Sequence, residues 1–172
     1  MQVLKIIAEL MELAARTAPK TKGEDFVVTK IINGDEINRL VEAMLKFGED
    51  SGKAGFTRDA ENVKLSEQVL LIGIKDARPA GLNCGACGLT SCTQVVGQEI
   101  GECKAPQCAF RYLDLGIALG SAVRTASELC ADNRIMYRIG VAARKAGIIS
   151  ADFVLGIPVS GSGKNIYFDR RL

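Results

Sequence analysis

The chain has 172 residues, a length at which one domain buries a substantial core. Its hydrophobic content of 48% excludes a disordered chain, and its net charge of +2 gives no reason to expect a nucleic-acid partner. No apolar run is long enough to span a bilayer, and the basic start of a signal peptide is missing, so we expect a cytoplasmic protein without a membrane partner.

In the first half of the chain, the apolar pattern predicts three helices and two strands. Apolar residues recur at helical spacing from Val3 to Ala14, and Ala18-Pro19 ends that helix. A β-branched run and a nearly continuous apolar run predict the two strands. In chain order the predicted elements are a helix over 2–16, a strand over 26–32, a helix over 35–46 ended by Gly48, a loop over 48–55, a short helix over 58–63 capped by Thr57, and a buried strand over 69–75.

The second half begins with a break in periodicity over residues 77–109, which we expect to be an insertion between a strand and a long helix. Thr90 or Ser91 is suited to cap a short helix within it that runs to Ile100. After the insertion come predicted helices over 109–129 and 132–146, the second capped by Asp132 or Asn133 and ended by Gly147. A strand over 153–157 follows, and Pro158 indicates either its end or an edge of the sheet. The last predicted elements are a short strand over 166–168 and the basic tail Arg170-Arg171. The whole chain, 1–172, is therefore predicted to form a single α+β domain.

Four cysteines lie inside this insertion at the spacing C-x2-C-x4-C-x15-C: Cys84, Cys87, Cys92 and Cys108. Four thiolates at short, uneven spacing are typical ligands of a cubane iron–sulfur cluster, and neighbouring glycines let the backbone approach its inorganic core. A structural zinc site more often uses two separated C-x2-C pairs, and a thioredoxin-like pair leaves two of the cysteines unexplained. Because the chain has an ample core and no secretion signal, a disulfide framework is not favoured. The spacing thus predicts one [4Fe–4S] cluster on these cysteines.

Two other cysteines receive different interpretations. Cys103 is the competing fourth ligand, but we expect it to lie on the short helix, whereas Pro106 precedes Cys108 in a loop that can turn back. Cys130 ends a predicted helix among apolar residues and is expected to be a small buried core residue. The chain has no histidine, so a mixed Cys/His zinc site and a Ser-His-Asp mechanism are excluded.

The stretch CGACGLTSC resembles the single-cluster domain in the large subunit of the corrinoid iron–sulfur protein, and the B-type subunit of membrane-bound ferredoxin-oxidising complexes. This resemblance implies that Cys84, Cys87 and Cys92 hold a [4Fe–4S] cluster together with a fourth cysteine further along. In those domains the last spacing differs by one residue, and a proline follows the fourth cysteine where this chain has Ala109.

Over most of its length the chain resembles a family of uncharacterised ferredoxin-domain proteins. The matching stretches are AARTAPKTKG, FTRDAENV, GLNCGACG, CAFRYLDLGIALGSAV, DNRIMYRIGVAA and GIPVSGSGKN. The order of elements is also similar to the flavin-dependent nitroreductase fold, with Ala18-Pro19 at the place of its A-P-S loop and residues 114–122 at that of its central helix. This resemblance implies a nitroreductase-like mixed sheet flanked by helices, a homodimer, and FMN as a candidate second cofactor, although the R-R-S phosphate motif of that fold is missing.

Cations near both ends of the chain are candidate ligands for an FMN phosphate or another small anion. Arg16, Lys20 and Lys22 follow the first helix, and Lys164 lies in a glycine-rich loop whose backbone amides suit an anion. If the two outer strands are neighbours, we expect these segments to meet, with Arg170 beside them.

The helix predicted after the cysteines has features of its own. Gly116 and Gly120 suit either tight packing against a neighbouring element or a platform for a flat ring. Asp114 is expected to pair with Arg111 or Arg134. Three functions follow from the sequence: an electron-transfer module that serves a redox partner protein or a small-molecule electron acceptor, a flavin-dependent reductase fed by the cluster, and a structural or redox-sensing metal-site protein.

Overall fold

The computed structural model describes residues 1–168, and these form an α+β fold around one four-stranded sheet. The strand order is β1 (Val27–Ile32), β2 (Gln68–Ile74), β6 (Phe153–Ser160) and β5 (Asp132–Asn133). Every pairing in this sheet is antiparallel, so the mixed strand directions expected from the sequence are not observed. The register pairs Val27 with Ile74 and Ile74 with Phe153, which places the cysteine-containing segment at the same sheet end as the start of β1.

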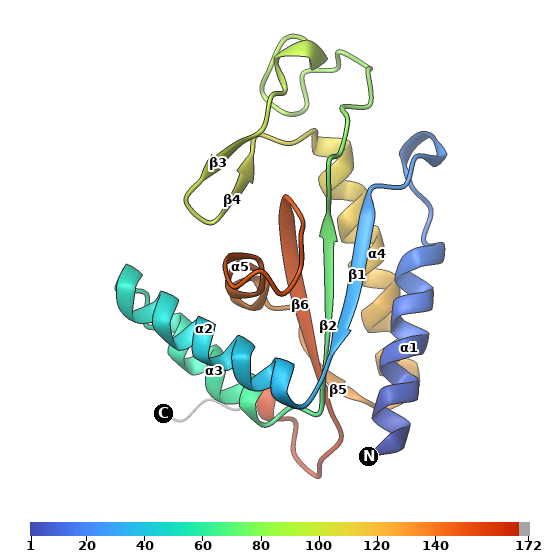
Figure 1. Cartoon of the computed structure of the whole chain (residues 1–172). Helices are drawn as coiled ribbons and strands as arrows, with labels where there is room; N and C mark the ends of the chain where they lie inside the picture. The colour runs from blue at the N-terminus through green and yellow to red at the C-terminus, as the bar shows by residue number, and fades with distance from the viewer. Residues whose placement is uncertain (169–172) are drawn as a thin grey trace.

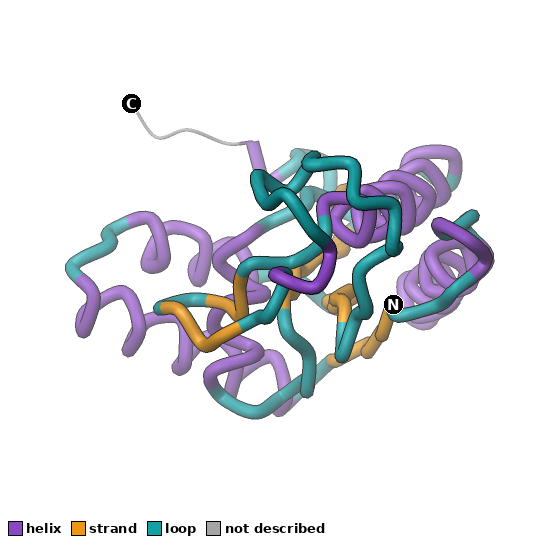
Figure 2. Tube along the Cα trace, turned by 90° about the horizontal axis from the view of Figure 1, so that it is seen from above, coloured by secondary structure: helices purple, strands orange, loops and turns teal. Residues whose placement is uncertain are grey.

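Helices cover both faces of the sheet (Figure 1). Helices α1 (Gln2–Thr17) and α4 (Ala109–Glu128) pack on one face, and α2 (Asp35–Ser51), α3 (Gly55–Lys64) and α5 (Tyr137–Lys145) lie on the other. Seen along the sheet from above, the strands lie between these two groups of helices (Figure 2). Within residues 1–168, no helix combines the length and the apolar character that crossing a membrane requires.

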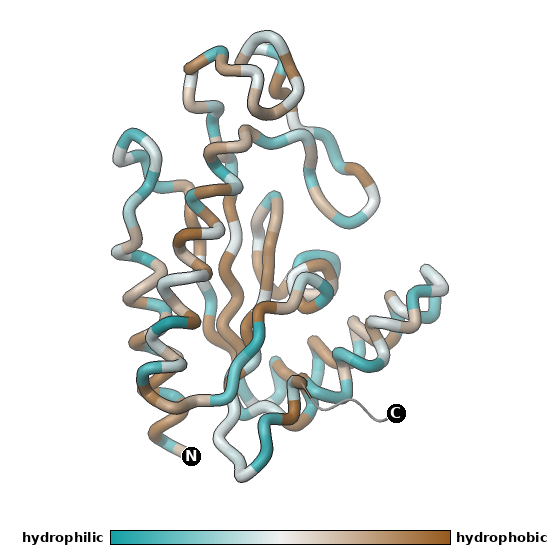
Figure 3. The backbone as a smooth tube through the Cα atoms, turned by 180° about the vertical axis from the view of Figure 1, so that it is seen from behind, coloured by the Kyte–Doolittle hydropathy of each residue, from teal (hydrophilic) through white to brown (hydrophobic). Residues whose placement is uncertain are grey.

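Strand β2 explains the two-sided arrangement. All seven of its residues are buried, with Leu70 and Ile72 in the core beneath α1 and α4, and Val69 and Leu71 in the core beneath α2 and α5. A strand buried on both faces reads as a continuous apolar run instead of an alternating one. The hydrophobic colouring along the central strands in Figure 3 follows this pattern.

The segment between β2 and α4 contains little regular structure. Ser91 caps a single 3₁₀ turn, Cys92–Gln94, and the helix expected to run on to Ile100 does not form. Instead β3 (Gln98–Ile100) and β4 (Cys103–Ala105) pair as a short antiparallel hairpin that projects from the rest of the fold (Figure 1).

Several predicted boundaries are wrong for identifiable reasons. Helix α2 continues through Gly48 and ends at Gly52, which has a left-handed backbone conformation. Gly48 is buried against Phe56: an added Cβ at this position would lie only 3.0 Å from the Phe56 Cβ, so the close packing favours a glycine here. Helix α5 begins only at Tyr137, because Asp132 and Asn133, expected to cap it, pair with β6 instead. Residues 166–168, predicted to form a short strand, form a 3₁₀ turn. The predicted basic tail Arg170-Arg171 lies outside the described residues.

Pro158 does not end β6, which continues to Ser160. Gly156 exchanges both backbone hydrogen bonds with Met136, so the alternation of a strand points the Pro158 nitrogen toward the same side. Strand β5, which lies on that side, pairs only with Ser160 and Val159, so it has no residue opposite Pro158. A proline without an N–H is therefore accommodated at a gap in the ladder.

Candidate functional site

The segment that carries the first three cysteines lies beyond one end of the sheet (Figure 1). Residues 81–86 are all exposed. Asn83 closes this loop: its backbone N–H donates to Sγ of Cys92 at 3.3 Å, and its Oδ1 accepts from the Cys92 N–H at 2.8 Å. Gly85 and Gly88 have backbone φ angles of +74° and +83°, which residues other than glycine rarely adopt. The loop backbone thus follows the conformation for which its glycines are suited.

The four cysteines of the predicted cluster differ in exposure. Cys84 is exposed, Cys87 and Cys92 are half-buried, and Cys108 is buried. Cys108 immediately precedes α4 as its N-cap residue. The backbone N–H groups of the first turn of α4, which have no carbonyl partner inside the helix, therefore lie next to this cysteine.

In the part of the chain that the structure describes, no three Cys, Asp or Glu side chains converge as ligands of one metal ion. The donor chemistry nevertheless fits an iron–sulfur cluster, because residues 84–108 contain five thiols, of which a cubane needs four, and no imidazole. That segment buries little of itself, since Leu82 is 49% exposed and Val96 is 63% exposed. In such segments metal binding and ordering of the chain are coupled, so the ligands need not be gathered beforehand.

Cys103 lies on β4, next to the turn of the hairpin, and not on a helix as expected. It is close to Tyr112 and Tyr137 of the scaffold. Burial raises the pKa of both phenols, and a negative charge at Cys103 would raise them further. The hydrogen bond that Tyr137 donates to Glu102, at 2.7 Å, also raises the Tyr137 pKa and holds the hairpin turn against α5.

Cys130 is exposed, so its interpretation as a buried core residue is wrong. It follows the end of α4 with φ of +57°, a left-handed conformation more often occupied by glycine or asparagine. The next residue, Ala131, returns its N–H to the carbonyl of Ala126 at 2.9 Å and closes the helix end. Cys130 therefore lies in the turn that ends α4 and does not pack in the core.

A buried ion pair joins the start of α4 to the segments around the cysteines. Arg111 is completely buried and contacts Asp114 at 3.1 Å, one of the two pairings expected from the sequence. Its Nε also donates to the carbonyl of Arg78 at 2.8 Å, and it pairs with Glu24. Asp114 accepts in turn from the backbone N–H and the hydroxyl of Thr21, both at 2.7 Å. Arg111 thus ties α4, the Thr21 turn and the base of the cysteine loop together, which no local sequence signal indicated.

The structure separates the cations predicted to bind a phosphate. Arg16 pairs with Asp25 at 2.6 Å, and Lys20 donates to the carbonyls of Arg16 and Ala18 at 2.8 Å each. These two side chains hold the end of α1 against the segment before β1. Lys22 remains exposed and approaches Gly81, at the base of the cysteine loop.

Lys164 does not meet those cations within the chain. It follows Ser160, which pairs with Asp132 at the far end of the sheet, whereas Lys22 precedes Val27 at the near end. Strand β2 also lies between β1 and β6, so the condition under which these segments were expected to meet, neighbouring outer strands, is not fulfilled. Arg170, expected beside Lys164, lies outside the described residues.

The glycines of α4 face outward. An added Cβ on Gly116 or Gly120 would meet no atom of residues 1–168 within 4 Å, so packing within this part of the chain does not require a glycine at either position. Tight packing of this helix is instead made by its alanines, Ala118, Ala122 and Ala126, which are fully buried.

Comparison with solved structures identifies the class of fold. The chain aligns with a nitroreductase-like family protein from Bacillus cereus at a TM-score of 0.62 and 12% identity, over 98% of this chain and 80% of the other. An FMN-dependent nitroreductase from Mycobacterium smegmatis, solved with NADPH, aligns at a TM-score of 0.61 and 10% identity, over 92% and 78%. This chain therefore has a nitroreductase-like α+β fold with a cysteine-rich segment, as predicted.

Sequence comparison identifies the family. An "Uncharacterized protein" of Archaeoglobus fulgidus is 49% identical over 169 residues, which cover 97% of this chain and 91% of the relative. The family model described as "Uncharacterized protein containing a ferredoxin domain" matches residues 104–170, a range that includes Cys108. The chain belongs to this family of ferredoxin-domain proteins, which confirms the resemblance drawn from its sequence.

Proposed function

We propose that this chain is an iron–sulfur protein in which Cys84, Cys87, Cys92 and Cys108 hold one [4Fe–4S] cluster. When bound, such a cluster supplies one-electron transfer, here to or from a redox partner protein or a small-molecule electron acceptor. The observation that carries the proposal is the exposed cysteine loop, in which the Asn83 N–H already donates to Sγ of Cys92. The ferredoxin-domain description of the family supports it.

The environments of the two candidate fourth ligands favour Cys108. The Cys108 residue lies at the positive end of α4, in a stretch that Arg111 ties to the base of the cysteine loop through the carbonyl of Arg78. Cys103 belongs to the projecting hairpin and lies near Tyr112 and Tyr137. Binding a cluster through a residue at the start of a fixed helix loses less conformational entropy than binding it through a residue beside the turn of a short hairpin.

Iron and sulfide analysis of the protein after anaerobic reconstitution tests this proposal. We expect about four iron atoms and about four sulfides per chain, as cubane ligation by four thiolates requires. Zinc in place of iron, with no acid-labile sulfide, would contradict the electron-transfer function and favour a structural metal site.

A flavin-dependent reductase is the second candidate function, because the chain shares its fold with FMN-dependent proteins such as that of Mycobacterium smegmatis. Within the chain, Lys22 is exposed at the same sheet end as the cysteine loop and is suited to contact a phosphate. The two chains are only 10% identical, and one fold can serve many functions. Electron transfer by the cluster is therefore our first proposal.

Titration of FMN into reconstituted protein separates the two functions. If FMN binds, its fluorescence is expected to be quenched below about 50 micromolar, where a site of micromolar affinity is occupied, and Lys22→Gln should weaken binding about tenfold through loss of one phosphate contact. Lys46→Gln, an exposed lysine of α2, is the matched control. Unquenched flavin would leave the cluster as the sole redox group of this proposal.

We also propose that the chain forms a homodimer through the outer face of α1 and α4. Exposed apolar side chains line this face: Val3, Ile6, Leu10 and Leu13 on α1, and Leu113 and Ile117 on α4. Gly116 and Gly120 lie on the same side of α4 with open space beside them. An exposed glycine inside a helix costs about 1 kcal/mol relative to alanine, a cost that close approach of a second chain would offset.

Light scattering at micromolar concentration is expected to give twice the chain mass of 18.4 kDa. The Ile117→Arg variant should be monomeric, since it places a charge in the apolar face. Gly120→Ala is a finer test: it should weaken the dimer if a second backbone packs on Gly120. In a chain that stays monomeric, the same change should only raise stability, by about 1 kcal/mol. A wild-type monomer would contradict the assembly.

A further inference from the structure

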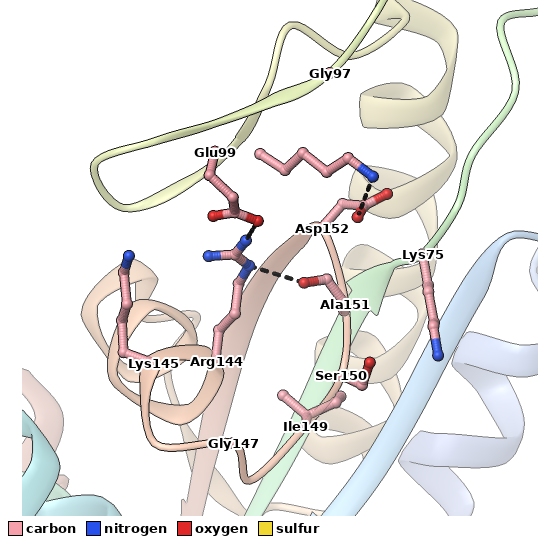
Figure 4. A pocket seen from close by; sticks show the side chains of 11 residues that line it. Lys75, Gly97, Glu99, Arg144, Lys145, Gly147, Ile149, Ser150, Ala151 and Asp152 are labelled. Atoms are coloured by element: carbon pink, nitrogen blue, oxygen red, sulfur yellow. Dashed lines mark hydrogen bonds and ion pairs between the residues drawn. The ribbon is translucent and has the colours of Figure 1, made fainter.

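A pocket of about 750 Å³ opens between the β3–β4 hairpin, the end of α5 and the adjoining ends of β2 and β6 (Figure 4). This volume is within the range of small-molecule sites. The hairpin contributes Glu99 and Lys104, and the scaffold contributes Lys75, Arg144 and Lys145. The pocket is therefore formed jointly by the cysteine-containing segment and by the scaffold, and none of the cysteines lines it.

The charges lining the pocket are unbalanced. Four cations and two carboxylates, Glu99 and Asp152, line it, an excess of two positive charges. That excess equals the formal net charge of the whole chain, +2. Both carboxylates are already engaged: Asp152 pairs with Lys104 at 3.3 Å, and Glu99 pairs with Arg144, whose hydrogen bond lowers the Glu99 pKa and keeps it ionised.

Arg144 is a fixed group at this site. Its side chain is only 11% exposed, and its Nε donates to the carbonyl of Ala151 at 2.8 Å. With Glu99 bound at Nη2, its Nη1 has no hydrogen-bond partner among residues 1–168. A guanidinium held in this way presents donors to an anion without first losing side-chain freedom.

Two lysines supply the remaining charge. Lys75 and Lys145 form no ion pair with a carboxylate within the described chain, and they stand on opposite sides of the pocket (Figure 4). A ligand that satisfies both must carry negative charge at two separated positions. Lys145 follows Arg144 directly, so one anionic group would meet both of these cations.

We propose that this pocket binds a small organic anion with two separated negative groups, phosphates or carboxylates, held by Arg144 and Lys145 at one end and by Lys75 at the other. The site is distinct from the cysteine loop and does not depend on the proposed cluster. Because Glu99 and Lys104 belong to the hairpin, the ligand would also fix the hairpin against α5.

Calorimetric titration of the full chain with pyrophosphate and, separately, with succinate tests the proposal in about 0.15 M KCl, where non-specific surface attraction is screened. We expect at least one of the two to bind with a Kd of about 1 mM or lower. Preference for pyrophosphate identifies a phosphorylated ligand, and preference for succinate identifies a dicarboxylate.

The variants Lys75→Gln and Lys145→Gln should each weaken that binding about tenfold, which corresponds to about 1.4 kcal/mol. Among residues 1–168, neither lysine makes an ion pair that these substitutions would break. Lys64→Gln, at the exposed end of α3, removes the same charge elsewhere and should leave binding unchanged. Absence of binding by both anions at about 5 mM, or equal affinity of the two pocket variants and the wild type, would overturn the proposal.

Discussion

Serine in place of any one of Cys84, Cys87, Cys92 and Cys108 is expected to reduce the iron content after anaerobic reconstitution from about four atoms per chain to less than about one. A hydroxyl is a much poorer ligand for iron in a cluster than a thiolate, and a cubane with four protein ligands depends on each of them. Iron and sulfide assays on each variant, beside the wild type, measure the effect.

The chain provides matched controls, because two further cysteines lie outside the proposed ligand set. Cys130→Ser changes an exposed residue at the end of α4, and Cys103→Ser changes a residue of the hairpin. Both variants are expected to retain about four iron atoms. If Cys103→Ser lost the iron and Cys108→Ser kept it, the assignment of the fourth ligand would be incorrect and the hairpin would have to fold over the cysteine loop.

The scaffold was predictable where burial determines structure directly. The apolar run at 69–75 predicted a buried strand, and all of β2 is buried between two helical layers. The amphipathic spacing from Val3 to Ala14 predicted α1, although it did not show that one apolar stripe of this helix faces outward. Apolar periodicity reports which side chains avoid water, and not whether a second element of the same chain covers them.

The cysteine segment was less predictable because few of its side chains are buried. The Ser91 cap and its partner Gln94 are present, as a helix start requires. The helix stops after one turn because Val95, Val96 and Gly97 are poor helix formers, and the next residues pair as a hairpin about Gly101, whose φ is +56°. Hairpin pairing in so short a segment depends on the turn and on contacts with the scaffold, such as Tyr137 with Glu102.

Positions that depend on strand order could not be predicted from local pattern. The expected meeting of Lys164 with Lys22 required β1 and β6 to be neighbours, but β2 separates them. No local pattern in the sequence indicated the pocket either, because Lys75 and Lys145 belong to segments that meet only in the folded chain. Such sites arise from long-range contacts, which single-sequence patterns do not encode.

Replacement of Arg111 by leucine is expected to lower the free energy of unfolding by about 3–5 kcal/mol, because it leaves the buried Asp114 carboxylate without its counter-charge. Asp114 is only 3% exposed and keeps only its two hydrogen bonds from Thr21. This loss is a large fraction of the stability of a typical domain, and urea unfolding measures it. Arg124→Ala, which breaks an exposed pair with Glu128, should cost less than about 1 kcal/mol.

The double variant Arg111→Leu/Asp114→Leu distinguishes the two roles of Arg111, neutralising Asp114 and donating hydrogen bonds to the neighbouring loops. Removal of both charges should recover part of the lost stability, since two apolar groups do not leave a buried charge unpaired. The carbonyl of Arg78 and the Thr21 turn would still lose their links to α4, so iron incorporation should stay below that of the wild type even where stability is regained. Full recovery of both stability and iron content would show that Arg111 only neutralises Asp114 and has no part in holding the base of the cysteine loop against the helix that begins after Cys108.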